Sequence, residues 1–288
     1  MHVELELYCG RMEQQSEIKT ISILGCGWYG LPMAKSLLNQ GYHLKGSTTT
    51  EAKLSSLSDA GIKPFLIDTE KESFDEEFFE CDLLIISIPP KVNSDQLPYP
   101  VKVKNIATAA QKAGVKQVIL ISSTGIYEDG NFVVDETVAP NPNTPSGLAL
   151  KEAESVLLNN NAFTSTIIRF AGLIGPDRNL AKHFAGKADI ANGNAPINLI
   201  HLNDCLGLTQ AIINQKAFGK IYHGVTPSHP ARKEFYSKAC IASGFEAANF
   251  KDELLSWKQV DSKNVPELLA YEFKVKDWLA YAVTNFKI

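Results

Sequence analysis

Three glycines, at positions 25, 27 and 30, constrain the fold of this chain more than any other feature of its sequence. They follow an apolar run, residues 18–24, and open an amphipathic stretch, residues 31–38. Glycines at this spacing between a strand and a helix are typical of dinucleotide-binding turns. Gly25 would permit the tight turn, Gly27 would let the backbone approach a pyrophosphate, and Gly30 would let the helix pack closely on the strand. The free N–H groups at the start of the helix would face the phosphates. The alternative is a glycine turn that only packs a helix against a sheet.

The first half of the chain alternates short apolar runs with helical patterns, which predicts an α/β fold with a doubly wound parallel sheet of the Rossmann type. Two of the runs, within residues 82–87 and 117–121, are almost entirely apolar, as strands buried on both faces should be. The expected strands are residues 20–24, 43–46, 63–67, 82–87, 117–121 and 165–170. The expected helices lie near residues 32–39, 51–60, 101–113 and 148–158.

After Phe170 the regular alternation stops and turn-rich segments follow. We therefore expect residues 19–170 to form an NAD(P)-binding Rossmann domain, with return segments near residues 197–225. Residues 171–196 and 226–288 would form a smaller C-terminal substrate lobe that closes over the nucleotide.

Composition excludes several classes of protein. A formal net charge of −4 does not suit a general nucleic-acid binder, and the chain contains no run of about 18 apolar residues that could span a membrane. Five cysteines are scattered without a close pair, which favours free thiols in a reducing cytoplasm and excludes zinc-site spacing, so no metal site is expected. Cys26, inside the glycine turn, is expected to serve as a small side chain and not as a nucleophile. The first 19 residues do not have the pattern of a secretory signal.

The residues expected to contact the dinucleotide come from the glycine turn and from the ends of the second and fourth strands. They are Gly25, Gly27, Trp28, Tyr29, Gly30, Ser47, Thr48, Thr49, Ser87, Ile88 and Pro89. NAD enzymes place an acidic residue at the end of the second strand, where this chain has residues 46–50, GSTTT. The hydroxyl groups there favour NADP over NAD, although no arginine is present to bind a 2′-phosphate. The alternative is a Ser/Thr-rich turn without cofactor selectivity.

Three later motifs occur in a fixed order. Residues 121–127 (ISSTGIY) end a strand, residues 169–176 (RFAGLIGP) end the next, and residues 200–204 (IHLND) begin a helix. This ordered set resembles the extended short-chain dehydrogenase/reductases, the nucleotide-sugar epimerase and dehydratase group, and more narrowly their atypical YeeZ-type branch. The resemblance covers about residues 19 to 280, and it implies a Rossmann domain with a variable substrate lobe. The stretches that match the narrower branch are residues 122–128, 169–187 and 229–232.

One part of the chain departs from this family. Typical members carry a Tyr-x-x-x-Lys pair on the helix after the Ser-Ser-Thr strand, and the lysine lowers the pKa of the tyrosine that transfers a proton. Here Ser146 aligns with the tyrosine and Leu150 with the lysine. Lys151 lies one residue later, about 100° further around the helix. The usual acid/base pair is therefore expected to be absent.

The remaining catalytic candidates are Ser123, Thr124 and Tyr127. The resemblance implies that Ser123 polarises a substrate carbonyl. Tyr127 is either a substitute acid or a ring that packs the loop, and we favour the packing role. The candidates for an anionic substrate pocket are Arg178, His183, His201 and Arg232. Asp204 is expected to cap the helix of residues 205–213, although pairing with His201 as acid and base is the alternative.

Two functions remain open. The first is an NAD(P)-dependent enzyme of the epimerase, dehydratase or reductase type that acts on a small molecule with non-standard acid/base residues. The second is a dinucleotide-binding regulator or redox sensor without catalysis. A third resemblance, of residues 25–34 to the start of β-hydroxyacid dehydrogenases, is weaker because the later motifs do not suit that family. The chain is expected to be cytoplasmic, without nucleic-acid or membrane partners, and an oligomer is possible.

Overall fold

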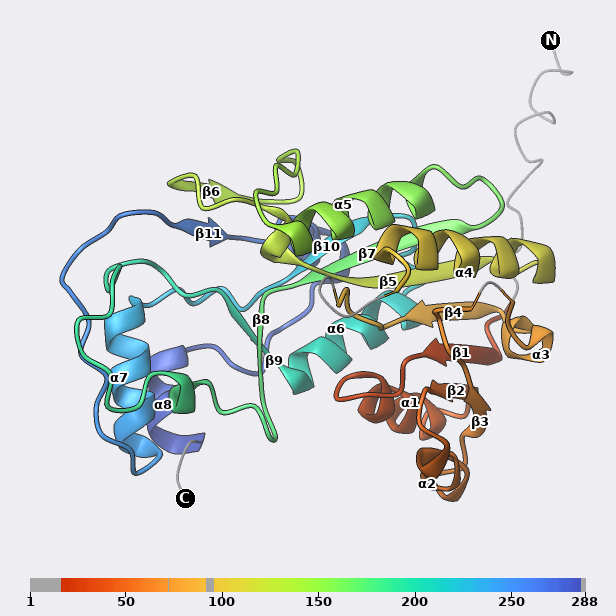
Figure 1. The fold of residues 1–288 in the computed structure, drawn as a ribbon, viewed down its shortest axis with the longest axis horizontal. Helices are drawn as coiled ribbons and strands as arrows, with labels where there is room; N and C mark the ends of the chain where they lie inside the picture. The colour runs from red at the N-terminus through yellow and green to blue at the C-terminus, as the bar shows by residue number, and fades with distance from the viewer. Residues whose placement is uncertain (1–16, 72, 92–95, 286–288) are drawn as a thin grey trace, which may run out of the picture.

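The computed structural model describes residues 17–71, 73–91 and 96–285. Its centre is a sheet of seven strands in the order β10-β7-β5-β4-β1-β2-β3, and all neighbouring pairs are parallel (Figure 1). The strands are β1 (Thr20–Leu24), β2 (His43–Thr48), β3 (Lys63–Leu66), β4 (Leu83–Ile86), β5 (Gln117–Ser123), β7 (Thr164–Phe170) and β10 (Ile221–Gly224). The order turns back at β1, which confirms the predicted doubly wound α/β fold.

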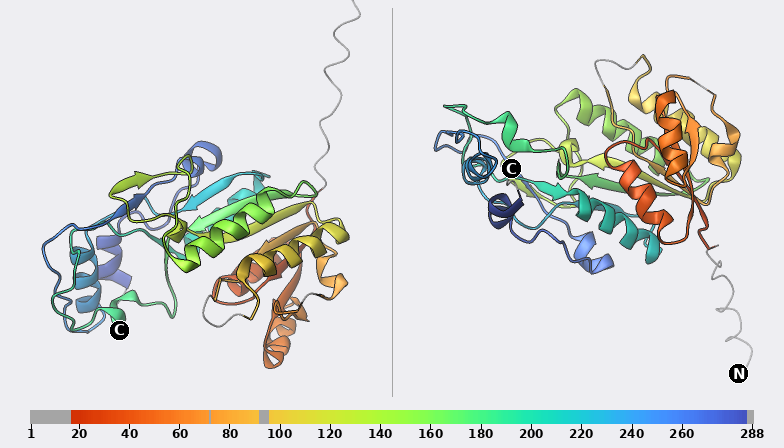
Figure 2. Two further views of the ribbon diagram at one scale, coloured as in Figure 1. Left: turned by 45° about the horizontal axis from the view of Figure 1, so that its top comes forward. Right: turned by 90° about the horizontal axis from the view of Figure 1, so that it is seen from below.

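Helices cover both faces of this sheet, as Figure 2 shows. One face packs against α1 (Gly30–Leu38) and α6 (Leu202–Asn214), with Met33, Leu37 and Leu208 fully buried. The other face packs against α3 (Glu76–Phe79), α4 (Tyr99–Ala113) and α5 (Pro145–Leu158). Because β4 is covered on both sides, all four of its residues are apolar and none is exposed. A short α2 (Leu54–Asp59), preceded by the 3-10 turn η1 (Glu51–Lys53), connects β2 to β3.

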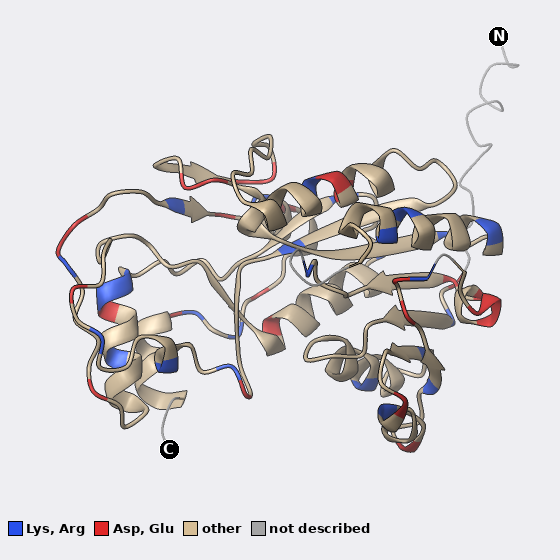
Figure 3. Cartoon of the chain, viewed as in Figure 1, with Lys and Arg blue, Asp and Glu red and all other residues tan. Residues whose placement is uncertain are grey.

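A second apolar core lies beside the sheet. It is built by β8 (Gly172–Ile174), η3 (Leu180–His183), β9 (Leu199–His201), α7 (Arg232–Ala242) and α8 (Trp278–Asn285). Trp278 and Phe235 are fully buried in it. We call residues 172–199, 226–257 and 275–285 the second lobe (Figure 1, left). Acidic and basic residues are interspersed along the elements around the sheet and in this lobe (Figure 3).

The segment between the two helices of the lobe returns to the sheet. Strand β11 (Lys258–Val260) pairs with β6 (Phe132–Val134), which follows the short turn η2 (Thr124–Ile126). A π-helical turn η4 (Val265–Leu269) comes next, and Val265 and Leu269 are buried in the core of the sheet. Residues 258–269 therefore tie the second lobe to the sheet.

Several boundaries differ from the sequence-based expectations. The strand β10 was not among the predicted strands. Helix α5 begins three residues earlier than expected because the Thr144 hydroxyl accepts a hydrogen bond from Gly147 N–H at 3.1 Å. The predicted cap at Asp204 is wrong. Helix α6 starts at Leu202, and the His201 ring caps it by accepting from Asn203 N–H at 3.1 Å.

In the described part of the chain, no helix is both long and apolar enough to cross a membrane. Among the same residues, no group of three or more His, Cys, Asp or Glu side chains could hold a metal ion.

Candidate functional site

The three glycines form a tight turn between β1 and α1. Gly25 has a φ of +100°, a conformation that side-chain-bearing residues rarely adopt. A Cβ atom at Gly30 would lie 2.2 Å from the Gly25 carbonyl oxygen, so only glycine allows the helix to start this close to the strand. A Cβ atom at Gly27 would meet nothing within 4 Å. The turn therefore leaves open space in front of Gly27, where the fingerprint requires the backbone to approach a pyrophosphate.

The ends of two neighbouring strands hold this turn in place. At the end of β2, the buried Ser47 hydroxyl accepts a hydrogen bond from Gly25 N–H at 2.9 Å. Beyond β4, the Ser87 hydroxyl donates to the Gly25 carbonyl oxygen at 2.8 Å, and Ile88 packs against Gly25. Pro89 follows and is exposed. Ser47 and Ser87 thus stabilise the conformation of the turn by hydrogen bonds to the N–H and the carbonyl oxygen of Gly25.

The residues after Ser47 do not bond to the glycine turn. Thr48 accepts a hydrogen bond from Thr50 N–H at 3.1 Å, and Thr49 is exposed. Among the hydroxyl groups predicted to recognise a 2′-phosphate, the one on Ser47 is buried against the glycine turn. Thr48 and Thr49 remain for that role. Cys26 is held between the turn and β2, and burial raises the pKa of its thiol to about 12, so the thiol stays protonated at neutral pH.

The two aromatic residues of the turn point in different directions. The Tyr29 ring lies in the core, packs edge-on against Phe170, and shares a 2.8 Å hydrogen bond with the Thr209 hydroxyl. Only the backbone of Tyr29 is left to face a ligand. The Trp28 indole N–H instead donates to the Pro176 carbonyl oxygen at 2.7 Å, which joins the glycine turn to the second lobe.

Ser123 and Thr124 stand where β5 ends, on the strand beside β4. The Ser123 hydroxyl oxygen accepts from Gly125 N–H at 3.0 Å, and Thr124 is buried. This turn packs closely on the start of α5, because a Cβ atom at Gly147 would lie 2.8 Å from the Gly125 carbonyl oxygen. Parallel strands present their carboxyl ends at one edge of a sheet, so Ser123 shares this edge with the glycine turn.

Tyr127 points inward, into a buried polar network. Its hydroxyl contacts His223 Nε2 at 3.0 Å and accepts a hydrogen bond from Arg169. The ring is 2 % exposed, and burial raises the pKa of the phenol to about 12. His223 is fully buried, and its other ring nitrogen lies 2.9 Å from the Asp261 carbonyl oxygen. These contacts fit the packing role for Tyr127.

The four candidates for an anionic pocket do not come together. Arg178 and His201 both lie beside Gly175, with Arg178 stacked on Trp28. His183 is exposed on η3. Arg232 donates to the Ala191 carbonyl oxygen at 3.0 Å, and its guanidinium lies over two rings of the second lobe, Phe184 and Phe250. Burial lowers the pKa of His201, which favours a neutral ring that carries its proton on Nε2, since Nδ1 is the helix cap.

Comparisons with known proteins agree with this geometry. Residues 25–196 match the family model described as NAD(P)H-binding. The chain is 33% identical to Protein YeeZ of Escherichia coli K12 over 269 residues, which cover 90% of this chain and 97% of that protein. This chain is an atypical extended short-chain dehydrogenase/reductase.

Solved structures of low sequence identity have the same fold. A Bacillus cereus UDP-glucuronic acid 4-epimerase in complex with NAD superimposes with a TM-score of 0.77 at 18% identity, over 93% of this chain and 95% of that one. A putative NAD-dependent epimerase/dehydratase from Methylobacillus flagellatus gives a TM-score of 0.74 at 22% identity, over 92% and 96%.

Helix α5 carries the two positions, Ser146 and Leu150, that we expected to correspond to a Tyr-x-x-x-Lys pair. Ser146 is exposed at the start of the helix. Leu150 is 6 % exposed and packs in the core. Lys151 is exposed and lines a shallow surface depression with Leu148 and Glu152.

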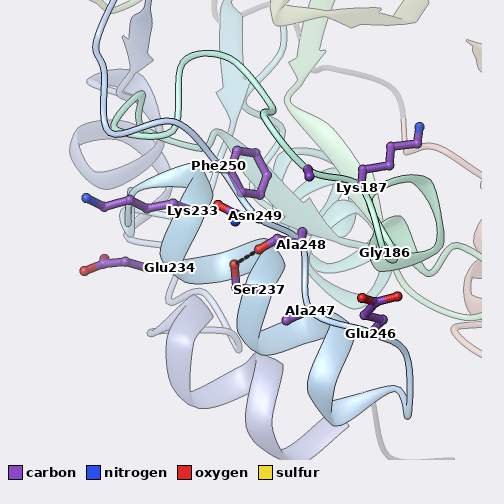
Figure 4. Close-up of a pocket in the computed structure, with 11 residues that line it drawn as sticks. Gly186, Lys187, Lys233, Glu234, Ser237, Glu246, Ala247, Ala248, Asn249 and Phe250 are labelled. Atoms are coloured by element: carbon purple, nitrogen blue, oxygen red, sulfur yellow. Dashed lines mark hydrogen bonds between the residues drawn. The ribbon is translucent and has the colours of Figure 1, made fainter.

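Sequence reasoning missed one feature of this short-chain dehydrogenase/reductase. An open surface pocket of about 640 Å³ lies in the second lobe, between α7 and the segments around Gly186 and Phe250 (Figure 4). Lys233 and Glu234 of α7 and Lys187 and Glu246 of the two segments line it. None of the sequence-predicted site residues does so. Gly186 and Lys187 end a stretch that matches the family, but the other walls come from distant parts of the chain, so no local pattern predicts the site.

Proposed function

We propose that this chain is an NAD(P)-dependent enzyme of the epimerase, dehydratase or reductase type that acts on a small molecule. The observation that carries the proposal is the open space in front of Gly27, at the sheet edge that also bears Ser123. An anion there would receive hydrogen bonds from the first N–H groups of α1 and would feel the positive end of the helix dipole. The first turn of α1 contains no acidic residue that would oppose it.

The residues around this space fit a dinucleotide. The backbone of residues 25–30 would hold the pyrophosphate, Thr48 and Thr49 the adenosine ribose, and Ile88 and Pro89 the chain of the cofactor beyond β4. When bound, the nicotinamide ring supplies hydride acceptance or donation. Ser123 would donate its hydroxyl hydrogen to the substrate oxygen, because its oxygen already accepts from Gly125 N–H.

The proposed enzyme works without the usual Tyr-x-x-x-Lys pair. Support comes from Ser146 at the tyrosine position, from Leu150 in the core, and from Lys151 on the outer surface. Tyr127 does not supply the missing phenol in this proposal, because Arg169 and His223 engage its hydroxyl inside the protein. The proton for the substrate oxygen would then come through the hydroxyl of Ser123 or from solvent.

The proposed cofactor is NADP. The end of β2 offers Thr48 and Thr49 and no carboxylate that would repel a 2′-phosphate. The preference over NAD should be modest because no arginine lies in residues 46–50. One of the solved structures named above is bound to NAD and does not support a preference for NADP. The preference proposed here therefore rests on Thr48 and Thr49.

The alternative is a dinucleotide-binding regulator or redox sensor, and the inward-facing Tyr127 favours it because a phenol is then missing from the strand end. The two functions differ in one measurement. The purified protein loaded with NADPH is mixed with carbonyl compounds, and the protein loaded with NADP⁺ is mixed with nucleotide sugars. Absorbance at the nicotinamide band and conversion of each compound to product are both followed, because an epimerase or dehydratase returns its hydride and leaves no net change in absorbance. Turnover that Ser123→Ala reduces about 10²-fold or more, with cofactor affinity unchanged, supports the enzyme. Tight cofactor binding without turnover on any panel supports the regulator.

A further inference from the structure

A tight turn of the second lobe ends at Arg178. Arg178 N–H donates to the Gly175 carbonyl oxygen at 3.0 Å, and Asp177 has a φ of +61°. Proline at the second position and a positive φ at the third are the features of a type II turn. The sequence Gly-Pro-Asp-Arg therefore fixes the backbone from which the Arg178 side chain departs.

This turn is seated on Trp28, the residue after Gly27. The Trp28 indole N–H donates to the Pro176 carbonyl oxygen at 2.7 Å, and a Cβ atom at Gly175 would lie 3.2 Å from the indole ring. The Arg178 guanidinium carbon lies 4.3 Å from the centre of the Trp28 ring. A cation–π stack of this kind holds the guanidinium plane in place beside the glycine turn.

The charge of Arg178 is not neutralised by a neighbour. Within residues 17–71, 73–91 and 96–285, no carboxylate forms an ion pair with it, and the side chain is exposed. The other two arginines of this part of the chain are engaged, Arg169 by Glu154 and Arg232 by the Ala191 carbonyl oxygen. Stacking occupies one face of a guanidinium but leaves its in-plane N–H donors available.

We propose that Arg178 binds the pyrophosphate of the dinucleotide held on the glycine turn. This inference rests on the proposed function, since it needs a dinucleotide in front of Gly27. The planar guanidinium offers two parallel N–H donors that match two phosphate oxygens, and the stack on Trp28 places them beside the turn whose backbone faces the same group. Arg178 is then a phosphate-binding residue that the second lobe contributes to the nucleotide site. Cofactor binding would draw the lobe and the sheet together.

The test compares three variants by calorimetric titration with NADPH, ADP and adenosine. Arg178→Gln should weaken NADPH and ADP binding about tenfold or more, because a hydrogen-bonded charge is lost, and should leave adenosine binding unchanged. The affinity of Arg178→Lys for NADPH and ADP should lie between those of Arg178→Gln and the unmodified protein. An ammonium group keeps the charge but lacks the two parallel N–H donors of a guanidinium. Lys238→Gln, which removes the same charge from the exposed face of α7, should bind all three as the unmodified protein does.

The outcomes separate this inference from the proposed function. Unmodified protein that binds neither NADPH nor ADP would overturn both. If the unmodified protein and Arg178→Gln bind NADPH with equal affinity, only the role of Arg178 in cofactor binding is overturned. The arginine would then be a candidate to bind a phosphate or carboxylate of the substrate. If Arg178→Gln loses as much affinity for adenosine as for ADP, the proposal is also contradicted, because adenosine has no phosphate. Thermal unfolding of each variant checks that the exposed substitution has not altered the fold.

Discussion

Arg169 and Glu154 form a buried ion pair that joins β7 to α5. Arg169 Nε donates to the two carboxylate oxygens at 3.1 and 3.2 Å, and its terminal nitrogen donates to Oε2 at 2.6 Å. Both side chains are 3% exposed. The Ser122 hydroxyl also donates to Glu154 at 2.6 Å, so the pair holds α5 against the residue that precedes Ser123. The geometry of the strand end therefore depends on a charge pair that no ligand would touch.

Removal of one partner should leave an uncompensated buried charge. Arg169→Met should lower the free energy of unfolding by about 3–5 kcal/mol, measured by urea denaturation. The double variant Arg169→Met with Glu154→Leu should recover most of that loss, because apolar side chains of similar size replace a buried pair at little net cost. A single variant with less than about 1 kcal/mol of destabilisation would show that the pair is not buried as described.

Tyr127→Phe tests whether the phenol packs the loop or transfers a proton. The change removes the hydroxyl that Arg169 and His223 contact, so it should destabilise the protein by about 1–3 kcal/mol in urea denaturation. Affinity for NADPH should not change. Tyr222→Phe is the control, since that hydroxyl donates to the Ala217 carbonyl oxygen and has no hydrogen bond to a charged group among the described residues, and a smaller loss of stability is expected. An active enzyme that loses turnover in Tyr127→Phe at unchanged stability would make Tyr127 the missing acid.

The nucleotide-binding half could be predicted from the sequence because its signals are local. The glycine spacing depends on backbone conformation at Gly25 and close packing at Gly30, and both follow from residues within six positions. The apolar runs of β4 and β5 predict burial on both faces, and both strands are interior strands of the sheet. Strand β10 was missed because its sequence, Ile-Tyr-His-Gly, is short and contains His223, whose burial depends on partners far away in the chain.

The candidate site could be predicted only where position along a strand decides it. Ser123 was placed correctly at the end of β5, but the direction of the Tyr127 side chain depends on Arg169 and His223, which are 42 and 96 residues away. The sequence predicts a helix cap at Asp204 because polar residues favour that position. Its carboxylate instead accepts hydrogen bonds from residues 271–275, and no local sequence pattern connects those residues with Asp204. An arginine within the apolar run of β7 was the one local signal of a buried partner.

Asp204 holds the segment that leads from the sheet back into the second lobe. Its buried carboxylate accepts from Lys274 N–H at 2.7 Å, from Val275 N–H at 3.3 Å and from the Tyr271 hydroxyl at 3.0 Å. Asp204→Ala should release these groups and lower the free energy of unfolding by about 2–4 kcal/mol. Amide hydrogen exchange should rise at residues 271–275 before it rises in α6. Unchanged exchange in that segment would show that the carboxylate is not its anchor.

Thr48→Asp tests cofactor choice. The unmodified protein should bind NADPH more tightly than NADH, and the new carboxylate should reverse that order by repelling the 2′-phosphate and accepting a hydrogen bond from the ribose. An aspartate can replace Thr48 locally, because its carboxylate can also accept from Thr50 N–H. Ser58→Asp, an exposed position on α2, adds the same charge elsewhere and should keep the order. Equal affinities in the unmodified protein would mean that the threonine turn does not select the cofactor.

Dinucleotide binding in front of Gly27 is tested most directly by calorimetric titration of NADPH into the unmodified protein and into Gly27→Asp. A Cβ atom at this position meets nothing within 4 Å, so the variant should melt at the same temperature as the unmodified protein. Its carboxylate would occupy the space of the pyrophosphate, and like charges there should weaken binding about 10²-fold or more. Ser56→Asp, an exposed change on α2, should bind normally. Equal affinity for NADPH in Gly27→Asp and in the unmodified protein, with the fold intact, would contradict the nucleotide site described here.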